Sequence, residues 1–180
     1  LLFLEIDEIK FEKVYEELLS DLKLTSHENI FQMSSSKCRQ FRMNIPRYTF
    51  ERNQQMGVTK VGTDVQVRPE QFNDLIMLYK GWKDDGIAYN LFGHFGDAHL
   101  HFNFMPKPEE LELCKLKLEK FYHQVKFMTG SPFAEHGIGI LKKKYIKPFY
   151  NEIQVEMFKL LKSTYDPDNI LFPNGFMSPK

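Results

Sequence analysis

Residues 93–104, with the sequence GHFGDAHLHFNF, contain the pattern that most restricts how this chain can fold. Apolar and polar residues alternate through the second half of the stretch, which is the two-residue period of a β-strand. One face of that strand is apolar and the other is polar: Leu100, Phe102 and Phe104 against His99, His101 and Asn103. The pattern predicts a sheet with one face toward a core and one face that carries imidazole and amide groups.

A turn precedes this strand. Gly96 and Asp97 favour a tight connection, so the residues before them are predicted to form a second, antiparallel strand. The two predicted strands cover residues 87–95 and 98–105. A two-residue turn places His94 directly opposite His99, and directly opposed side chains point to the same face with Cβ atoms about 5 Å apart. Three of the six histidines are therefore expected on one surface.

The rest of the chain predicts strands and helices in mixed order. Residues 1–6 are short and apolar, as in a buried strand, and residues 61–67 alternate as in a half-buried one. Apolar residues at the spacing of a helix follow Asp7, Pro69 and Pro108, and a fourth such segment lies near the C-terminus. The polar stretch 23–57 has no sustained period and predicts a long, partly ordered loop. We expect an α+β fold, an antiparallel sheet with helices packed on one face.

Length and composition limit the class of protein. With 180 residues and 42% hydrophobic side chains, we expect one domain with its own core over residues 1–180. The 24 basic and 24 acidic residues balance, so charge favours neither nucleic acid nor an anionic membrane. No apolar run approaches the roughly 20 residues of a transmembrane helix.

Two further features concern the setting of the chain. Its two cysteines have no motif spacing, which favours reduced thiols in the cytoplasm, with peripheral membrane association as the alternative. The chain opens on LLFLEI without a methionine, and we interpret it as a piece of a longer protein. The basic run at residues 142–147 is interpreted as a solvated face.

The histidine cluster indicates a metal site. Imidazoles this close repel each other when protonated, whereas their neutral nitrogens can converge on a divalent cation. Glu135 and His136 lie in a glycine-rich loop whose backbone freedom lets side chains point inward, and the carboxylate would complete the site. The alternative for a single histidine is an ordinary surface or hydrogen-bonded residue, which we prefer for His27 and His123. Mixed nitrogen and oxygen ligands suit zinc or manganese.

Three stretches, GHFGDAHLHFNF, AEHGIGILKKKYI and YDPDNILFP, together resemble the C-terminal domain of FAD-linked oxidases of the vanillyl-alcohol oxidase type. This group includes D-lactate dehydrogenase, the glycolate oxidase flavoprotein subunit and D-2-hydroxyglutarate dehydrogenase. The blocks occur in the same order, from about Gly81 to the end. The resemblance implies a ferredoxin-like cap domain that binds a metal and a small D-2-hydroxy acid. FAD would be held mainly by a separate N-terminal domain, so this chain alone is expected to be inactive.

The resemblance also assigns the central residues of the site. His94, His101 and Glu135 match the family's ligands of a divalent metal. His136 matches the base that takes the hydroxyl proton of the substrate while hydride passes to the flavin. A metal that binds the carboxylate and hydroxyl oxygens, beside a base that titrates near neutrality, is consistent with that chemistry.

Substrate contacts follow from the same resemblance. Asn103 matches an asparagine near the substrate, while Arg42 and Lys60 look like the groups that hold the substrate carboxylate. His99 replaces a family asparagine on the ligand face and is a candidate substrate contact or fourth metal ligand. Phe172 stands where the family usually has an asparagine near the flavin.

Two alternatives remain open, and the departures at His99 and Phe172 motivate the first of them. One is a non-catalytic metal-binding module that retains the family fold. The other is a flavoprotein relative that acts on a different substrate, such as an alkyl-glycerone-phosphate. The sequence does not indicate the electron acceptor.

Overall fold

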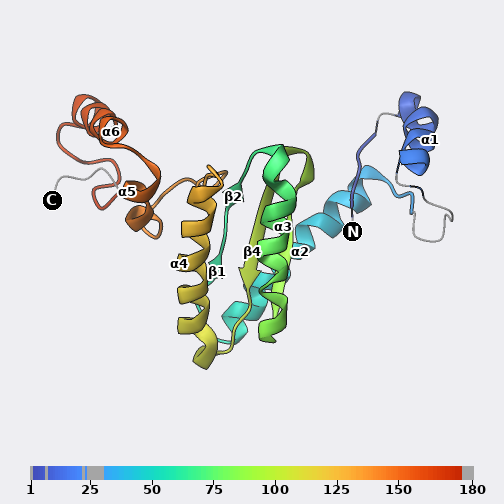
Figure 1. Cartoon of the computed structure of the whole chain (residues 1–180), viewed down its shortest axis with the longest axis horizontal. Coiled ribbons are helices and arrows are strands. Elements are labelled where there is room, and N and C mark those ends of the chain that lie inside the picture. The colour runs from blue at the N-terminus through green and yellow to red at the C-terminus, as the bar shows by residue number, and fades with distance from the viewer. Residues whose placement is uncertain (1, 7, 22, 24–30, 176–180) are drawn as a thin grey trace. The chain divides into compact units, whose positions relative to one another are not determined.

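The computed structural model describes residues 2–6, 8–21, 23 and 31–175. The chain divides into two compact units, Leu1–Tyr48 and Thr49–Lys180, and Figure 1 shows their elements. The first unit contains a 3-10 turn, η1 (Glu8–Lys10), the helix α1 (Phe11–Asp21) and the first part of α2 (Ser35–Gln55). The second unit contains the sheet and the histidines of the hairpin.

The strand predicted for residues 1–6 is wrong. Residues 2–6 form no strand with any part of the chain that the structure describes, and Leu2 and Leu4 are exposed. An apolar run becomes a strand only when a neighbour takes up its backbone hydrogen bonds, and the run itself does not specify that neighbour. The helix predicted after it is confirmed as α1, while its expected cap, Asp7, lies outside the described residues.

The loop predicted over residues 23–57 is also wrong for most of its length. Helix α2 runs for 21 residues, from Ser35 to Gln55, and includes Pro46. Its apolar residues do not gather on one side, so a search for a helical stripe does not detect it. Proline inside a helix also removes one backbone hydrogen bond, which makes the segment resemble a loop in sequence.

The sheet of the second unit is built around β4 (His99–Phe104). β3 (Tyr89–His94) pairs antiparallel with one side of β4. Two short strands, β1 (Val61–Gly62) and β2 (Val65–Gln66), pair antiparallel with its other side. The predicted antiparallel sheet is confirmed, and the predicted strand 61–67 is present with an interruption between β1 and β2.

The interruption has a local cause. The register is unchanged across it, so Thr63 and Asp64 stand opposite Phe102 and His101. The Thr63 N–H donates to the Phe102 carbonyl at 2.8 Å, but the Phe102 N–H donates to the Thr63 hydroxyl at 2.9 Å. The side chain thus takes the place of the Thr63 carbonyl, which instead lies 3.4 Å from Nδ1 of His101.

Two helices cover the apolar face of the sheet, as predicted: α3 (Phe72–Lys80) and α4 (Leu111–Phe127). Figure 1 shows both helices beside the strands of this unit. Each follows a 3-10 turn that begins with the predicted proline, η2 (Pro69–Gln71) and η5 (Pro108–Glu110). The Tyr79 ring stacks on Phe102 with centroids 5.2 Å apart and lies 4.9 Å from Phe121. Burying a side chain of this kind stabilises the fold by about 2–3 kcal/mol.

The last part of the chain contains two helices, α5 (Ile146–Phe149) and α6 (Glu152–Tyr165). α6 is the predicted final helix and begins at Asn151, whose side chain accepts the Gln154 N–H. The apolar stripe of α6 is 52–73% exposed and comprises Ile153, Met157, Leu160 and Leu161. Within the described ranges, no helix has the length and apolar character needed to cross a membrane.

Candidate metal centre

The hairpin that carries the histidines forms with the predicted register. His94 faces His99 across β3 and β4. The connection is longer than the predicted two-residue turn, because Phe95–Asp97 form a 3-10 turn (η4) and Ala98 follows with a φ of +49°. A left-handed backbone at an alanine costs roughly 1–2 kcal/mol. The predicted register is nevertheless found: His94 and His99 form the last residue pair between the two strands before the turn.

The polar face of β4 is buried rather than open to solvent. His99, His101 and Asn103 are 3%, 5% and 0% exposed. The loop that contains Glu135 and His136 lies over this face and brings its side chains to the histidines. A row of polar groups can be buried in this way only if each group finds a partner or a ligand.

Glu135 is the centre of the cluster. Its Oε1 lies 3.0 Å from Nε2 of His94 and 3.4 Å from Nδ1 of His99. Its Oε2 lies 3.2 Å from Nε2 of His101. The donor atoms of His101, Glu135 and His136 also lie within 4.8 Å of one another. The structure therefore brings the three predicted histidines to the predicted carboxylate, but in two groups of donor atoms: Glu135 groups with His94 and His99 on one side, and with His101 and His136 on the other.

The protonation of His101 supports a cation here. Its Nδ1 faces two acceptors, the Thr63 carbonyl at 3.4 Å and Asp64 Oδ1 at 3.9 Å. Burial lowers the pKa of His101, and the neighbouring His99 lowers it further, which favours the neutral ring. A neutral ring that donates from Nδ1 turns the lone pair of Nε2 toward the Glu135 carboxylate. In that tautomer both atoms of this 3.2 Å contact carry lone pairs that a divalent cation between them would bind, and imidazole with carboxylate suits zinc or manganese.

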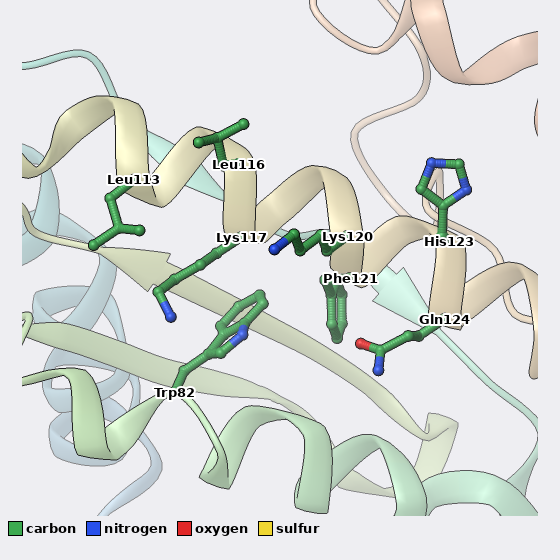
Figure 2. A pocket seen from close by; sticks show the side chains of 8 residues that line it. All are labelled: Trp82, Leu113, Leu116, Lys117, Lys120, Phe121, His123 and Gln124. Carbon is green, nitrogen blue, oxygen red and sulfur yellow. The ribbon is translucent and has the colours of Figure 1, made fainter.

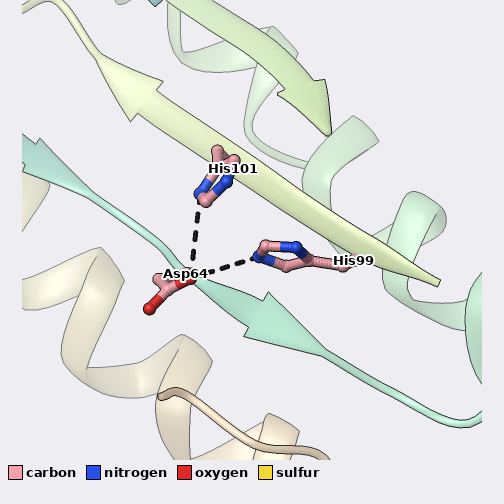
Figure 3. Close-up of side chains that lie close together, drawn as sticks. All are labelled: Asp64, His99 and His101. Atoms are coloured by element: carbon pink, nitrogen blue, oxygen red, sulfur yellow. Dashed lines mark hydrogen bonds and ion pairs between the residues drawn. The ribbon is translucent and has the colours of Figure 1, made fainter. Parts of the chain in front are cut away.

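Sequence reasoning missed Asp64, which is 2% exposed. Its Oδ1 accepts the Glu135 N–H at 3.1 Å and lies 3.1 Å from Nε2 of His99. Its Oδ2 accepts the His136 N–H at 3.0 Å and a hydrogen bond from Lys142 at 2.7 Å. Figure 3 shows Asp64 facing the two β4 histidines. The signal in the sequence was an acidic residue on the polar face of a strand.

The surroundings of Asp64 stabilise its ionised carboxylate. Burial acts to raise the pKa of its carboxyl group, but the Lys142 ammonium and the N–H groups of His136 and Glu135 outweigh burial and hold the pKa at about 2. The interpretation of residues 142–147 as a solvated face is therefore wrong for Lys142, which turns inward to this carboxylate. Spacing along the chain could not show this, because Asp64 and Lys142 are far apart in sequence.

The predicted substrate contacts lie in different places. Asn103 is fully buried beside Gly62, and neither of its amide atoms has a hydrogen-bond partner among the described residues. Lys60 precedes β1; desolvation lowers its pKa, whereas nearby Asp64 acts in the opposite direction. Arg42 belongs to the first unit, where its guanidinium lies 3.9 Å from Glu5.

Phe172, the other departure noted in the sequence, is exposed and has a φ of +50°. A surface depression of about 490 Å³ lies elsewhere, between Trp82 and α4 (Figure 2). It is lined by Lys117, Phe121 and other α4 residues, and by none of the predicted site residues.

Comparison with known proteins gives one family and several relatives. The family described as "FAD linked oxidases, C-terminal domain" matches residues 2–174. A putative mitochondrial D-lactate dehydrogenase of Schizosaccharomyces pombe is 34% identical over 86 residues, covering 48% of this chain and 16% of the relative. A D-2-hydroxyglutarate dehydrogenase of Stutzerimonas stutzeri is 33% identical over 87 residues, covering 46% and 19%. The glycolate oxidase subunit GlcD of Bacillus subtilis is 26% identical over 108 residues, covering 56% and 23%. The chain thus spans less than a quarter of the length of these relatives.

Proposed function

Since the chain belongs to the family of FAD linked oxidases, C-terminal domain, we propose that it binds the metal and the substrate of an FAD-dependent dehydrogenase of D-2-hydroxy acids. The relatives are named for D-lactate, D-2-hydroxyglutarate and glycolate, which are all small 2-hydroxy acids. FAD is held mainly by an N-terminal domain outside this chain. The cytoplasm remains the predicted location, although several relatives, the Schizosaccharomyces pombe protein among them, are named as mitochondrial.

One observation carries the proposal. The Glu135 carboxylate lies within 3.0–3.4 Å of nitrogens from three histidines, and two of those histidines are buried. A neutral His101 then points a lone pair at a carboxylate oxygen, and a divalent cation between the two atoms would bind both. We assign His94, His101 and Glu135 as the metal ligands.

When bound, the metal would supply a Lewis acid for the substrate hydroxyl and FAD would supply a hydride acceptor, chemistry that the side chains lack. The residues of this chain bind, orient and take the proton. His136 is exposed beside the Glu135–His101 contact and accepts the hydroxyl proton as general base. Its main-chain N–H is held by Asp64, which limits the positions that the ring can reach.

The substrate contacts are proposed from the family pattern. Lys60 binds the carboxylate of the 2-hydroxy acid, and partial desolvation strengthens its interaction with an anion. Arg42 belongs to the first unit and stays a prediction from the family pattern. Asn103 and His99 supply polar contacts on the β4 face. The Asn103 amide is buried and has no hydrogen-bond partner among the described residues, so a substrate that reached it would find both a donor and an acceptor.

A second candidate function is a metal-binding module without a redox role. The position of His99 favours it: the Nδ1 atom of His99 and the Nε2 atom of His94 both lie beside Oε1 of Glu135. A fourth protein donor closes the site if the ion stays four-coordinate, as in structural zinc centres, whereas a five-coordinate ion keeps one position for substrate.

The test is turnover by the longer protein that combines this chain with its flavin domain. D-lactate, D-2-hydroxyglutarate and glycolate, with L-lactate as the control, are offered with an artificial electron acceptor, and flavin reduction is followed under anaerobic conditions. The dehydrogenase predicts flavin reduction by at least one of the D-acids or glycolate and none by L-lactate. Bound metal with no reduction by any of them would favour the module.

A further inference from the structure

His99 is the buried residue whose surroundings the family pattern does not explain. Its ring is 3% exposed and has a carboxylate at each nitrogen. Nε2 lies 3.1 Å from Asp64 Oδ1, and Nδ1 lies 3.4 Å from Glu135 Oε1 (Figure 3 shows the Asp64 side of this arrangement). The donor atoms of His94, His99 and Glu135 lie within 4.8 Å of one another.

The two carboxylates constrain the ring differently. Asp64 already accepts two main-chain N–H groups and a hydrogen bond from Lys142, so it remains ionised and can only accept from His99. A neutral His99 must therefore carry its hydrogen on Nε2. Its Nδ1 then presents a lone pair to a Glu135 oxygen that also faces His94, and a cation among these three atoms would satisfy all of them.

We propose that Asp64 orients His99 as an additional metal ligand through Nδ1, beside His94 and Glu135. This inference rests on the proposed metal site and deepens it. The carboxylate–histidine–metal arrangement fixes both the tautomer and the direction of a ligand ring. Asp64 is in this proposal a positioning residue, since it acts on the cation through His99.

The same carboxylate fixes the loop that brings the remaining groups. Residues 132–138 form neither helix nor strand, yet the consecutive N–H groups of Glu135 and His136 both donate to Asp64. Lys142 balances the buried charge from the far side of the carboxylate and also donates to the Pro132 carbonyl at 2.8 Å. One side chain therefore sets the positions of a β4 ligand, the loop ligand and the proposed base.

The rival arrangement is a protonated His99 that bridges the two carboxylates without contacting any metal. The two arrangements differ in the number of histidine ligands on the metal. A Co²⁺ ion at the site has an absorption spectrum that depends on the number and type of its ligands. We therefore choose cobalt and zinc binding to the whole chain as the test, rather than turnover.

The experiment compares wild type with His99→Asn, Asp64→Asn and His101→Asn, with His123→Asn as a control on the exposed part of α4. Co²⁺ spectra and Zn²⁺ affinities from competition with a chelator are measured for each. We expect His99→Asn to change the Co²⁺ spectrum and weaken Zn²⁺ binding, and Asp64→Asn to weaken it about 10–100-fold. His123→Asn should match wild type. Circular dichroism of the metal-free proteins verifies that each variant is folded, and His99→Gln replaces His99→Asn if that variant is not.

The outcomes distinguish failure of the additional ligand His99 from failure of the proposed metal site itself. If His101→Asn loses the metal while His99→Asn keeps the wild-type spectrum and affinity, the metal site stands and the additional ligand is refuted. An unchanged spectrum in Asp64→Asn together with wild-type affinity would refute the positioning role. If wild type itself binds neither ion, the proposed metal site fails and this inference fails with it.

Discussion

Replacing Asp64 by asparagine should remove a pH-dependent part of the stability of the second unit. The pKa of Asp64 is held at about 2 in the folded chain, against 3.8 for the free side chain. A difference of nearly two pKa units corresponds to about 2 kcal/mol. Because the folded pKa is the lower one, this contribution is complete above the unfolded pKa and is lost as the pH falls through the folded pKa.

The assay is urea denaturation of metal-free wild type and Asp64→Asn at pH 7, 5, 3.5 and 2. We expect the variant to be less stable by about 2 kcal/mol at pH 7 and pH 5, and the difference to shrink below about 0.5 kcal/mol at pH 2. Glu119→Gln is a suitable control, because its carboxylate pairs with Lys144 on the surface. A difference that stays constant from pH 7 to pH 2 would show that the Asp64 charge is not what stabilises the loop.

Three further predictions concern the core, the β1–β4 contact and the proposed base. Tyr79→Phe removes a buried hydrogen bond of 2.6 Å to Thr63 and should lower the free energy of unfolding by about 1 kcal/mol, measured by urea denaturation, whereas Tyr165→Phe on the surface should not. Gly62→Ala would place a Cβ 2.5 Å from Asn103 Oδ1 and 2.9 Å from the Phe102 carbonyl oxygen, so a loss of about 1–3 kcal/mol is expected, whereas Gly96→Ala, which meets no atom within 4 Å, should cost less. His136→Gln in the longer flavoprotein should retain its metal by elemental analysis and slow flavin reduction about 100-fold or more; an unchanged rate would refute its role as base.

The parts of the fold that the sequence predicted are those set by local patterns. The His94–His99 register follows from a turn and an alternating strand that are adjacent in the chain. Helices α3 and α4 follow from apolar stripes and from prolines at their starts. In each case the residues that specify the element lie within it, so no distant partner had to be known.

The parts that were missed depend on distant partners or lack a pattern. The sequence of residues 2–6 predicts a strand, but the structure has none there. A strand needs a neighbouring strand for its backbone hydrogen bonds, and the spacing of apolar residues does not identify that neighbour. Helix α2 has no apolar stripe by which to recognise it. Asp64 joins the site only because the segment 61–66 pairs with β4 and places it opposite His101. Knowledge of that one strand pairing would have added Asp64 to the predicted site.

The central claim is that the histidines of the β3–β4 hairpin and Glu135 hold one divalent cation. The most direct measurement is the metal content of the purified chain by elemental mass spectrometry, for wild type, His101→Ala and the control His123→Ala, after incubation with zinc or manganese and removal of the excess. We predict about one ion per chain in wild type and in His123→Ala, and none in His101→Ala. Equal metal content in all three proteins, or none in wild type with either ion, would contradict the account.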